Sequence, residues 1–281
     1  MTDHVEGKVV VVTGAASGFG RLVAQMVAAR GARVVAADID AEGLAATAGS
    51  ITAADGTVAH RRTDVTDRAD VFGLAAFAVE SFGAIDVMVN NAGTMPLAFF
   101  ADHTRAADAW DRCIDINFRG VLNGIMAVHD QMIAQGRGQV INISSIYGNT
   151  PVAGSAVYTA TKAAVNVLSE TLRIESQGKI KVTVVKPTGV PGTNLGSGIV
   201  NGDAMVGILG QNAASFGEKA AVVWGPDDSP EKAAMTDPEN IGYWAIAPEE
   251  LATQVVYVID QPWGISISDI TVRASGDQYL S

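Results

Sequence analysis

The chain has 281 residues, of which 48% are hydrophobic, and it carries 30 glycines and a net charge of −11. A chain of this length can bury a hydrophobic core without disulfide bonds. Its net negative charge argues against a nucleic-acid binder, which needs a positively charged surface. The single cysteine, Cys113, excludes an intrachain disulfide and a cysteine-cluster metal site, so we expect no metal. The polar start and the lack of an apolar run of about 18 residues predict a soluble, cytoplasmic protein without a membrane segment.

Short β-branched runs alternate along the chain with longer stretches of helical periodicity. We expect strands over residues 9–12, 34–37, 57–62, 85–89, 139–143 and 180–185, and near 270–272. We expect helices over residues 18–30, 41–49, 67–82, 106–135, 155–177 and 248–259. Such alternation predicts parallel strands joined by right-handed crossovers. The predicted fold is therefore a doubly wound, Rossmann-type α/β sheet with helices on both faces, in one domain over residues 1–281.

The amino-acid composition changes after Lys186, because seven of the nine prolines lie beyond it. Residues 188–247 are too long for an ordinary connection, and long excursions in compact domains are usually lids or binding loops. We expect a substrate-binding lid with one or two short helices. Its apolar residues could form the lid's own core, a contact between subunits, or the wall of an apolar pocket.

A glycine-rich turn at residues 13–20 follows the first predicted strand and opens the first predicted helix. Gly14, Gly18 and Gly20, with Ser17 and Phe19 between them, would let the backbone approach a pyrophosphate at a helix N-terminus. A plain strand-to-helix turn is the alternative interpretation.

Asp38 follows the second predicted strand, 18 positions after Gly20. An acid at this place bonds the adenosine ribose hydroxyls in dinucleotide-binding folds. A carboxylate about 4 Å from a 2′-phosphate would cost on the order of 4 kcal/mol, so Asp38 favours NAD over NADP. The alternative is a solvated aspartate, or a cap for the next helix, for which Asp40 competes.

Tyr158 and Lys162 lie four positions apart in a predicted helix, which places both side chains on one face. The lysine ammonium would favour the phenolate and lower the tyrosine pKa, so the pair suits general acid/base work. An ordinary surface pair is the alternative.

Ser145 follows the fifth predicted strand, at the sheet edge where ligands bind. Asn117 lies inside the long predicted helix, where a buried asparagine needs a partner.

These motifs together resemble the short-chain dehydrogenase/reductase family over residues 8–186, and again in the final helix and strand. The matching positions are Gly14, Gly18 and Gly20, the NNAG run at residues 90–93, Asn117, Ser145 thirteen positions before Tyr158, and the YxxxK pair Tyr158 and Lys162. The resemblance implies an oxidoreductase that transfers a hydride between NAD(H) and a secondary alcohol or ketone.

The resemblance also implies roles for these residues. Tyr158 transfers the proton, Lys162 binds the nicotinamide ribose and lowers the Tyr158 pKa, Ser145 stabilises the reacting oxygen, and Asn117 holds a relay water. Asp64 and Val65 flank the adenine, and further cofactor contacts come from Asn91, Ala92, Gly93, Pro187, Val190 and Thr193. The family's usual glycine after Pro187 is Thr188 here, and Thr193 lies six positions beyond the proline rather than five, so the sequence leaves open whether this segment keeps the family's nicotinamide contacts.

Other activities stay open at this stage. The same residues serve relatives that act as isomerases, epimerases or dehydratases without net cofactor turnover, and a non-catalytic NAD-binding protein is a third possibility. The apolar lid and its shortage of basic residues predict an apolar small-molecule substrate. The resemblance further implies a homo-oligomer, a tetramer or a dimer, built through the long helices.

Overall fold

The computed structural model describes residues 3–191 and 193–279. Seven parallel strands form one sheet in the order β3-β2-β1-β4-β5-β6-β7. The strands are β1 (Val9–Thr13), β2 (Arg33–Asp38), β3 (Thr57–Arg62), β4 (Val87–Asn90), β5 (Gly138–Ile143), β6 (Ile180–Pro187) and β7 (Asp269–Val272). The predicted doubly wound parallel sheet is therefore confirmed, and the third strand begins and ends where the sequence placed it.

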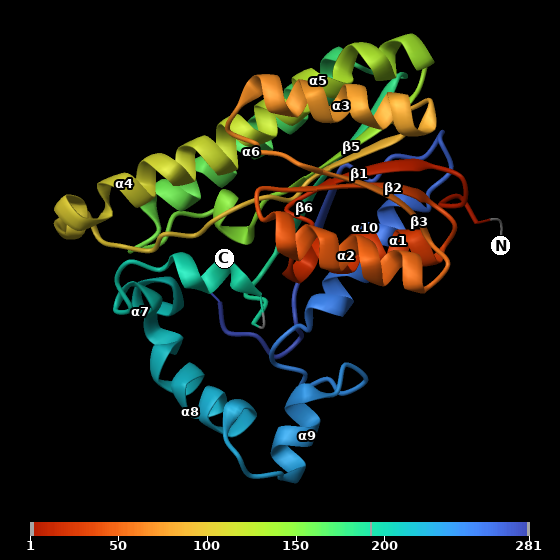
Figure 1. The fold of residues 1–281 in the computed structure, drawn as a ribbon. Helices are drawn as coiled ribbons and strands as arrows, with labels where there is room; N and C mark the ends of the chain where they lie inside the picture. Colours follow the sequence, from red (N-terminus) through yellow and green to blue (C-terminus); the bar gives the residue numbers. More distant parts are fainter. Residues whose placement is uncertain (1–2, 192, 280–281) are drawn as a thin grey trace.

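Helices cover both faces of this sheet. They are α1 (Gly18–Ala29), α2 (Ala41–Ala53), α3 (Arg68–Phe82), α4 (His103–Ile114), α5 (Val121–Gln135), α6 (Ala156–Glu175) and α10 (Pro248–Ile259). Figure 1 shows α1, α2 and α10 on one face, and α3, α5 and α6 on the other. The Asp67 carboxylate caps α3 by accepting from the N–H groups of Ala69 and Asp70.

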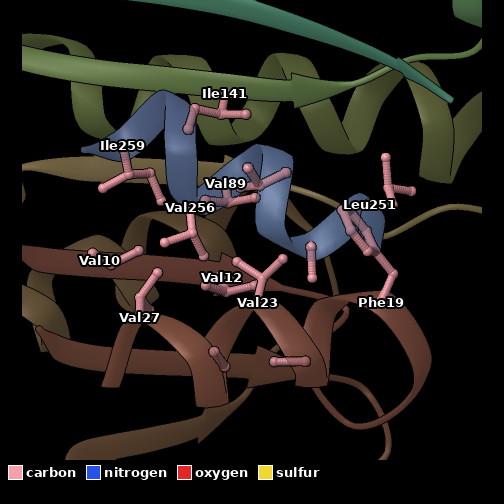
Figure 2. Packing of buried hydrophobic residues seen from close by; sticks show 14 of the residues in the cluster. Val10, Val12, Phe19, Val23, Val27, Val89, Ile141, Leu251, Val256 and Ile259 are labelled. Atoms are coloured by element: carbon pink, nitrogen blue, oxygen red, sulfur yellow. The ribbon is translucent and has the colours of Figure 1, made fainter. Parts of the chain in front are cut away.

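Alternate residues of β1 enter two separate cores, because successive side chains of a strand point to opposite faces. Val10 and Val12 pack among side chains of α1 and α10 (Figure 2), whereas Val9 and Val11 pack under α3 and α5. This burial on both sides explains why the strand is a continuous run of valines.

The strand order reverses at β1, which lies between β2 and β4. The connections that leave the carboxyl ends of β1 and β4 therefore diverge, and the crevice between them is where ligands bind in open α/β sheets. The glycine-rich turn and the NNAG run are the residues that follow these two strands.

The helix predicted over residues 106–135 lies within one helical segment, but that segment is not α-helical throughout. The helical segment begins at His103, and a π-helical turn, η2 (Asp115–Gly120), separates α4 from α5. The side-chain amide of Asn117, inside this turn, accepts from the Thr94 N–H and donates to the Thr94 carbonyl, both at 2.9 Å. These two hydrogen bonds stabilise the less favourable geometry of the π-helical turn. The spacing of apolar residues in the sequence gives no sign of such bonds.

The described residues of the predicted lid, 188–191 and 193–247, form three α-helices rather than one or two. They are α7 (Ala204–Leu209), α8 (Ala213–Trp224) and α9 (Pro230–Thr236). Proline at the first position and the Ser229 side-chain cap start α9. Figure 1 shows α8 and α9 extending away from the sheet. None of the helices in the described part of the chain is both long and apolar enough to span a bilayer.

Candidate active site

A cavity of about 820 Å³ lies at the carboxyl edge of the sheet, between the strand ends and helices α7 and α8. Its lining contains Gly14, Ser17, Gly18, Phe19, Gly20, Asp38, Asp64, Val65, Asn91, Ala92, Gly93, Ser145, Tyr158, Lys162, Pro187, Val190 and Thr193. The structure thus brings together every predicted site residue except Asn117, which lies fully buried behind the lining.

The glycine-rich turn forms one end of this cavity. Gly14 has φ of +69°, and a Cβ there would lie 2.7 Å from Asn91 Nδ2, so only glycine fits. Asn91 Nδ2 donates to the Thr13 carbonyl at 2.9 Å, which ties the two diverging loops together. Ser17 precedes α1 without a side-chain cap, so the first N–H groups of α1 are available to an anion.

Asp38 ends β2 at the same end of the cavity. Its carboxylate accepts from the Ala16 N–H at 2.9 Å and from the Asp40 N–H at 3.0 Å. Asp40, not Asp38, caps α2, so the interpretation of Asp38 as a helix cap was wrong. The two backbone bonds fix the Asp38 carboxylate against the glycine-rich turn.

Two arginines lie near Asp38, although neither lines the cavity. Arg21 donates to the Ala16 carbonyl and, through Nε, to Thr47 Oγ1 at 2.9 Å. Arg62 pairs in register with Asp38 across β2 and β3 and is exposed. Sequence reasoning considered only the positions next to Gly18 and Asp38 along the chain, so it missed both neighbours.

The middle of the cavity holds Ser145, Tyr158 and Lys162. Tyr158 and Lys162 lie on successive turns of α6 and are 4% and 5% exposed, so the interpretation as a surface pair was wrong. Lys162 Nζ donates to the Ile143 carbonyl at 2.8 Å and lies 5.7 Å from the Tyr158 ring centre. Ser145 follows β5, and its Oγ accepts from the Tyr147 N–H at 3.2 Å.

The pKa values of this pair reflect burial. Burial raises the pKa of Tyr158 to about 12, although its hydrogen bond with Ser145 acts to lower it. Burial lowers the pKa of Lys162 to about 8. The predicted lowering of the tyrosine pKa by Lys162 is not seen in the protein alone, because desolvation of the phenolate dominates.

Asn117 supports the site from behind. Its Nδ2 also donates to Cys113 Sγ and to Thr161 Oγ1, both at 3.3 Å. With the two Thr94 bonds, these contacts engage both ends of the amide. The Asn117 side chain therefore fixes the loop after Gly93 and the α6 turn that carries Lys162, rather than facing the cavity.

The altered segment after Pro187 lies at the junction of the cavity and the lid. Thr188 donates its backbone N–H to the Val272 carbonyl at 3.1 Å. Its hydroxyl is sealed from solvent without a hydrogen-bond partner among the described residues. Gly192, in the same predicted segment, lies outside the described residues. Val190 and Thr193 line the cavity despite the extra position.

Sequence reasoning missed one residue of the lining near the end of the chain. Tyr279 reaches the cavity from beyond β7, and no motif or periodicity there signals this position. Phe216 and Trp224, which the sequence placed among the apolar residues of the lid, also face the cavity.

Comparisons with known proteins agree with this geometry. The family model described as short chain dehydrogenase matches residues 8–203. An uncharacterized oxidoreductase of Listeria monocytogenes is 34% identical over 98% of this chain and 99% of that protein. A 2,5-dichloro-2,5-cyclohexadiene-1,4-diol dehydrogenase of Sphingobium indicum is 35% identical over 68% of this chain and 76% of that protein. The crystal structure of an actinorhodin polyketide ketoreductase variant with NADPH superposes with a TM-score of 0.74 at 28% identity, covering 98% and 99% of the two chains.

The chain therefore belongs to the short-chain dehydrogenase family. Within that family it is an oxidoreductase with a Rossmann-type sheet and a site for a nicotinamide dinucleotide.

Proposed function

We propose that this protein transfers a hydride between NAD(H) and an apolar secondary alcohol or ketone, with Tyr158 as the general acid/base. The observation that carries the proposal is the convergence of Ser145, Tyr158 and Lys162 in the same cavity as the glycine-rich turn and Asp38. A cavity that holds both acid/base groups and a dinucleotide-binding turn suits hydride transfer, because the substrate and the cofactor must lie next to each other.

The residues present fit a dinucleotide. The close approach at Gly14 and the uncapped start of α1 suit a pyrophosphate, and Asp38 suits the adenosine ribose. Asp64 and Val65 would flank the adenine, whereas Asn91, Ala92, Gly93, Pro187, Val190 and Thr193 would line the path toward the nicotinamide. When bound, the nicotinamide supplies the chemistry of hydride exchange.

The protein's own part in the reaction is proton transfer and orientation. Ser145 would hold the substrate oxygen beside Tyr158, which takes or gives its proton. Lys162, anchored on the Ile143 carbonyl, would bind the ribose hydroxyls and stabilise the phenolate. Asn117 would act as a positioning residue, because it holds the loop after Gly93 and the Lys162 turn in place.

Asp38 supports NAD as the preferred cofactor, because its fixed carboxylate would repel a 2′-phosphate by on the order of 4 kcal/mol. Arg21 is bound to the Ala16 carbonyl and Thr47, and Arg62 stands outside the cavity lining. Neither residue is in position to offset that repulsion without moving. The solved relative above contains NADPH, so the cofactor preference needs a direct test.

The substrate side of the cavity supports an apolar substrate. Its walls include Met95, Ile199, Met205, Ile208 and Phe216, and the residues 188–247 would act as a lid over them. A relative named as a cyclohexadiene-diol dehydrogenase supports a ring alcohol as a first candidate.

The test is NADH absorbance on mixing the protein with NAD and a panel of apolar cyclic secondary alcohols. We expect turnover with NAD and at least tenfold less with NADP, a gap that Asp38→Asn should narrow. Tyr158→Phe should reduce kcat by about a hundredfold or more, because the general acid/base is removed.

The controls separate the parts of the proposal. Tyr158→Phe should keep its affinity for NADH, since the other proposed cofactor-binding residues are unchanged. A preference for NADP would contradict the role of Asp38 and point to Arg62. Turnover without change in net NADH would indicate an isomerase or epimerase, and NAD binding without any reaction of the panel would favour the non-catalytic alternative.

A further inference from the structure

The chain returns to the cavity after its last strand. Beyond β7, the segment of residues 274–279, here called the C-terminal strap, passes between the lid and the sheet edge. At its end, the phenol of Tyr279 lies directly on the backbone of Gly189, where an added Cβ would fall 2.0 Å from both Cζ and the hydroxyl oxygen. The Tyr279 ring also meets Phe216 of α8 edge-on, with ring centres 5.6 Å apart. Tyr279 thus forms part of the wall of the cavity.

Three of the other four tyrosines have a hydrogen-bond partner for the side-chain hydroxyl, and the fourth is exposed. Tyr158 bonds Ser145, the Tyr147 hydroxyl donates to the Ile208 carbonyl at 3.1 Å, and the Tyr243 hydroxyl accepts from the Ala247 N–H at 2.6 Å. Tyr257 stands on the exposed side of α10.

The Tyr279 hydroxyl has no hydrogen-bond partner within residues 3–191 and 193–279, and it is not among their sealed polar atoms. It is therefore a hydroxyl without a protein partner in the lining of a cavity whose neighbouring side chains are apolar. Binding sites use a few placed polar groups of this kind to orient ligands.

The position of Tyr279 is fixed by the residue before it. The Gln278 side chain accepts from Trp244 Nε1 at 3.2 Å and donates to Ser215 Oγ at 2.5 Å. The Gln278 carbonyl accepts from Asn212 Nδ2 at 2.9 Å. The strap is thereby joined to the start of α8 and to the segment before α10, so the ring is held rather than free to swing away.

Tyr279 enters the cavity from beyond β7, whereas Tyr158 and Lys162 lie on α6. Tyr147 shares an apolar cluster with Tyr158 and Tyr279; burial raises the Tyr147 pKa, and both of these tyrosines add to that rise. A ligand whose reacting oxygen meets Tyr158 and Ser145 would reach Tyr279 only through a group remote from the reacting carbon.

We propose that Tyr279 is a specificity-determining residue that selects apolar alcohols or ketones carrying a second hydroxyl or carbonyl oxygen away from the reacting carbon. The inference rests on the proposed function for the identity of the reacting group. The Tyr279 hydroxyl bonds the remote oxygen, and the ring, backed by Gly189 and Phe216, sets the depth of the substrate half of the cavity.

The test compares two ligands that differ only in the second oxygen. A decalindiol with hydroxyls on opposite rings and the matching decalinol are titrated calorimetrically into the protein in the presence of saturating NADH, which cannot accept a hydride from an alcohol, so that binding is measured without turnover. Wild type should bind the diol more tightly. Tyr279→Phe should weaken diol binding roughly five- to tenfold and leave decalinol binding unchanged, as expected for one hydrogen bond lost. Tyr257→Phe, the matched control outside the cavity, should change neither dissociation constant.

The proposal would be overturned by equal binding of the two ligands by wild type, by no binding of either, or by an unchanged diol affinity in Tyr279→Phe. An equal loss for both ligands would also contradict it, because the ring rather than the hydroxyl would then be responsible. NADH formation is followed separately. Binding without NADH formation would refute the oxidoreductase proposal, while the dissociation constants would still decide the role of Tyr279.

Discussion

Lys162 is a buried cation that faces a backbone carbonyl, and no ion pair in the described part of the chain includes it. Burial lowers its pKa from 10.5 to about 8, which at about 1.4 kcal/mol per pKa unit is a penalty on the order of 3 kcal/mol near neutral pH. Lys162→Met removes that penalty and loses one hydrogen bond worth about 1 kcal/mol. We expect its Tm, by calorimetry without cofactor, to rise by roughly 5 °C while turnover is lost.

The pH dependence identifies the cause of this gain. Below pH 8 the ammonium is protonated in both states and the penalty is fully present. Between pH 8 and 10.5 only the unfolded chain holds the proton, so wild type gains stability as the pH rises. The difference from Lys162→Met should therefore shrink over that window. Lys179→Met, at an exposed lysine, should show no such trend, and a constant difference would show that packing rather than charge is responsible.

At the scale of single residues, the sequence predicted the positions in the cavity well and their environment less well. Spacing placed Tyr158 and Lys162 on one helix face, and the strand ends placed Gly14, Asp38 and Ser145 at one edge. Spacing carries no information about desolvation, so the raised pKa of Tyr158 could not be foreseen. Arg62 was missed because it is near Asp38 through strand pairing and not along the chain.

At the scale of elements, the strands were predictable because their valine-rich runs are buried on both faces. The π-turn at Asn117 was not, since it depends on bonds to Thr94, 23 positions away in sequence. The same holds for residues 188–247, where the existence of an insertion follows from length and proline content. The placement of α8 involves contacts with the C-terminal strap that no local pattern contains.

The strap makes the order of α8 testable. α8 has no buried residue, and two residues at its start, Asn212 and Ser215, bond Gln278. Gln278→Leu removes the side-chain bonds of Gln278 to Ser215 and Trp244, keeps a similar size, and leaves the bond from Asn212 to the Gln278 carbonyl intact. We expect amide hydrogen exchange in α8 to accelerate several-fold, while exchange in α6 stays unchanged, because local opening follows the loss of few contacts.

The control for this experiment is Gln261→Leu; among the described residues, the Gln261 side chain bonds just one group, the Tyr257 carbonyl of α10, at 2.8 Å. It should leave α8 exchange unchanged. If Gln278→Leu also leaves it unchanged, the strap does not hold the lid. If α6 exchange rises in parallel, the substitution has loosened the whole fold and the specific role of Gln278 is contradicted.

At the scale of the whole molecule, the long helices offer a surface for self-association. α6 exposes Val167 and Ile174, which are 67% and 61% accessible. They lie seven positions apart and so form one stripe. An exposed apolar stripe marks a candidate contact surface between protein chains. We therefore expect a homo-oligomer, a tetramer or a dimer, whose interface includes this face.

Light scattering coupled to size-exclusion chromatography tests this expectation. Wild type should elute with two or four times the mass of the chain. Val167→Glu combined with Ile174→Glu should yield monomers, because burying carboxylates in an apolar contact is costly. Ile241→Glu serves as the control, since Ile241 is 87% exposed in the segment beyond the lid helices. A monomeric wild type would contradict self-association, whereas an intact oligomer of the double variant would place the interface away from α6.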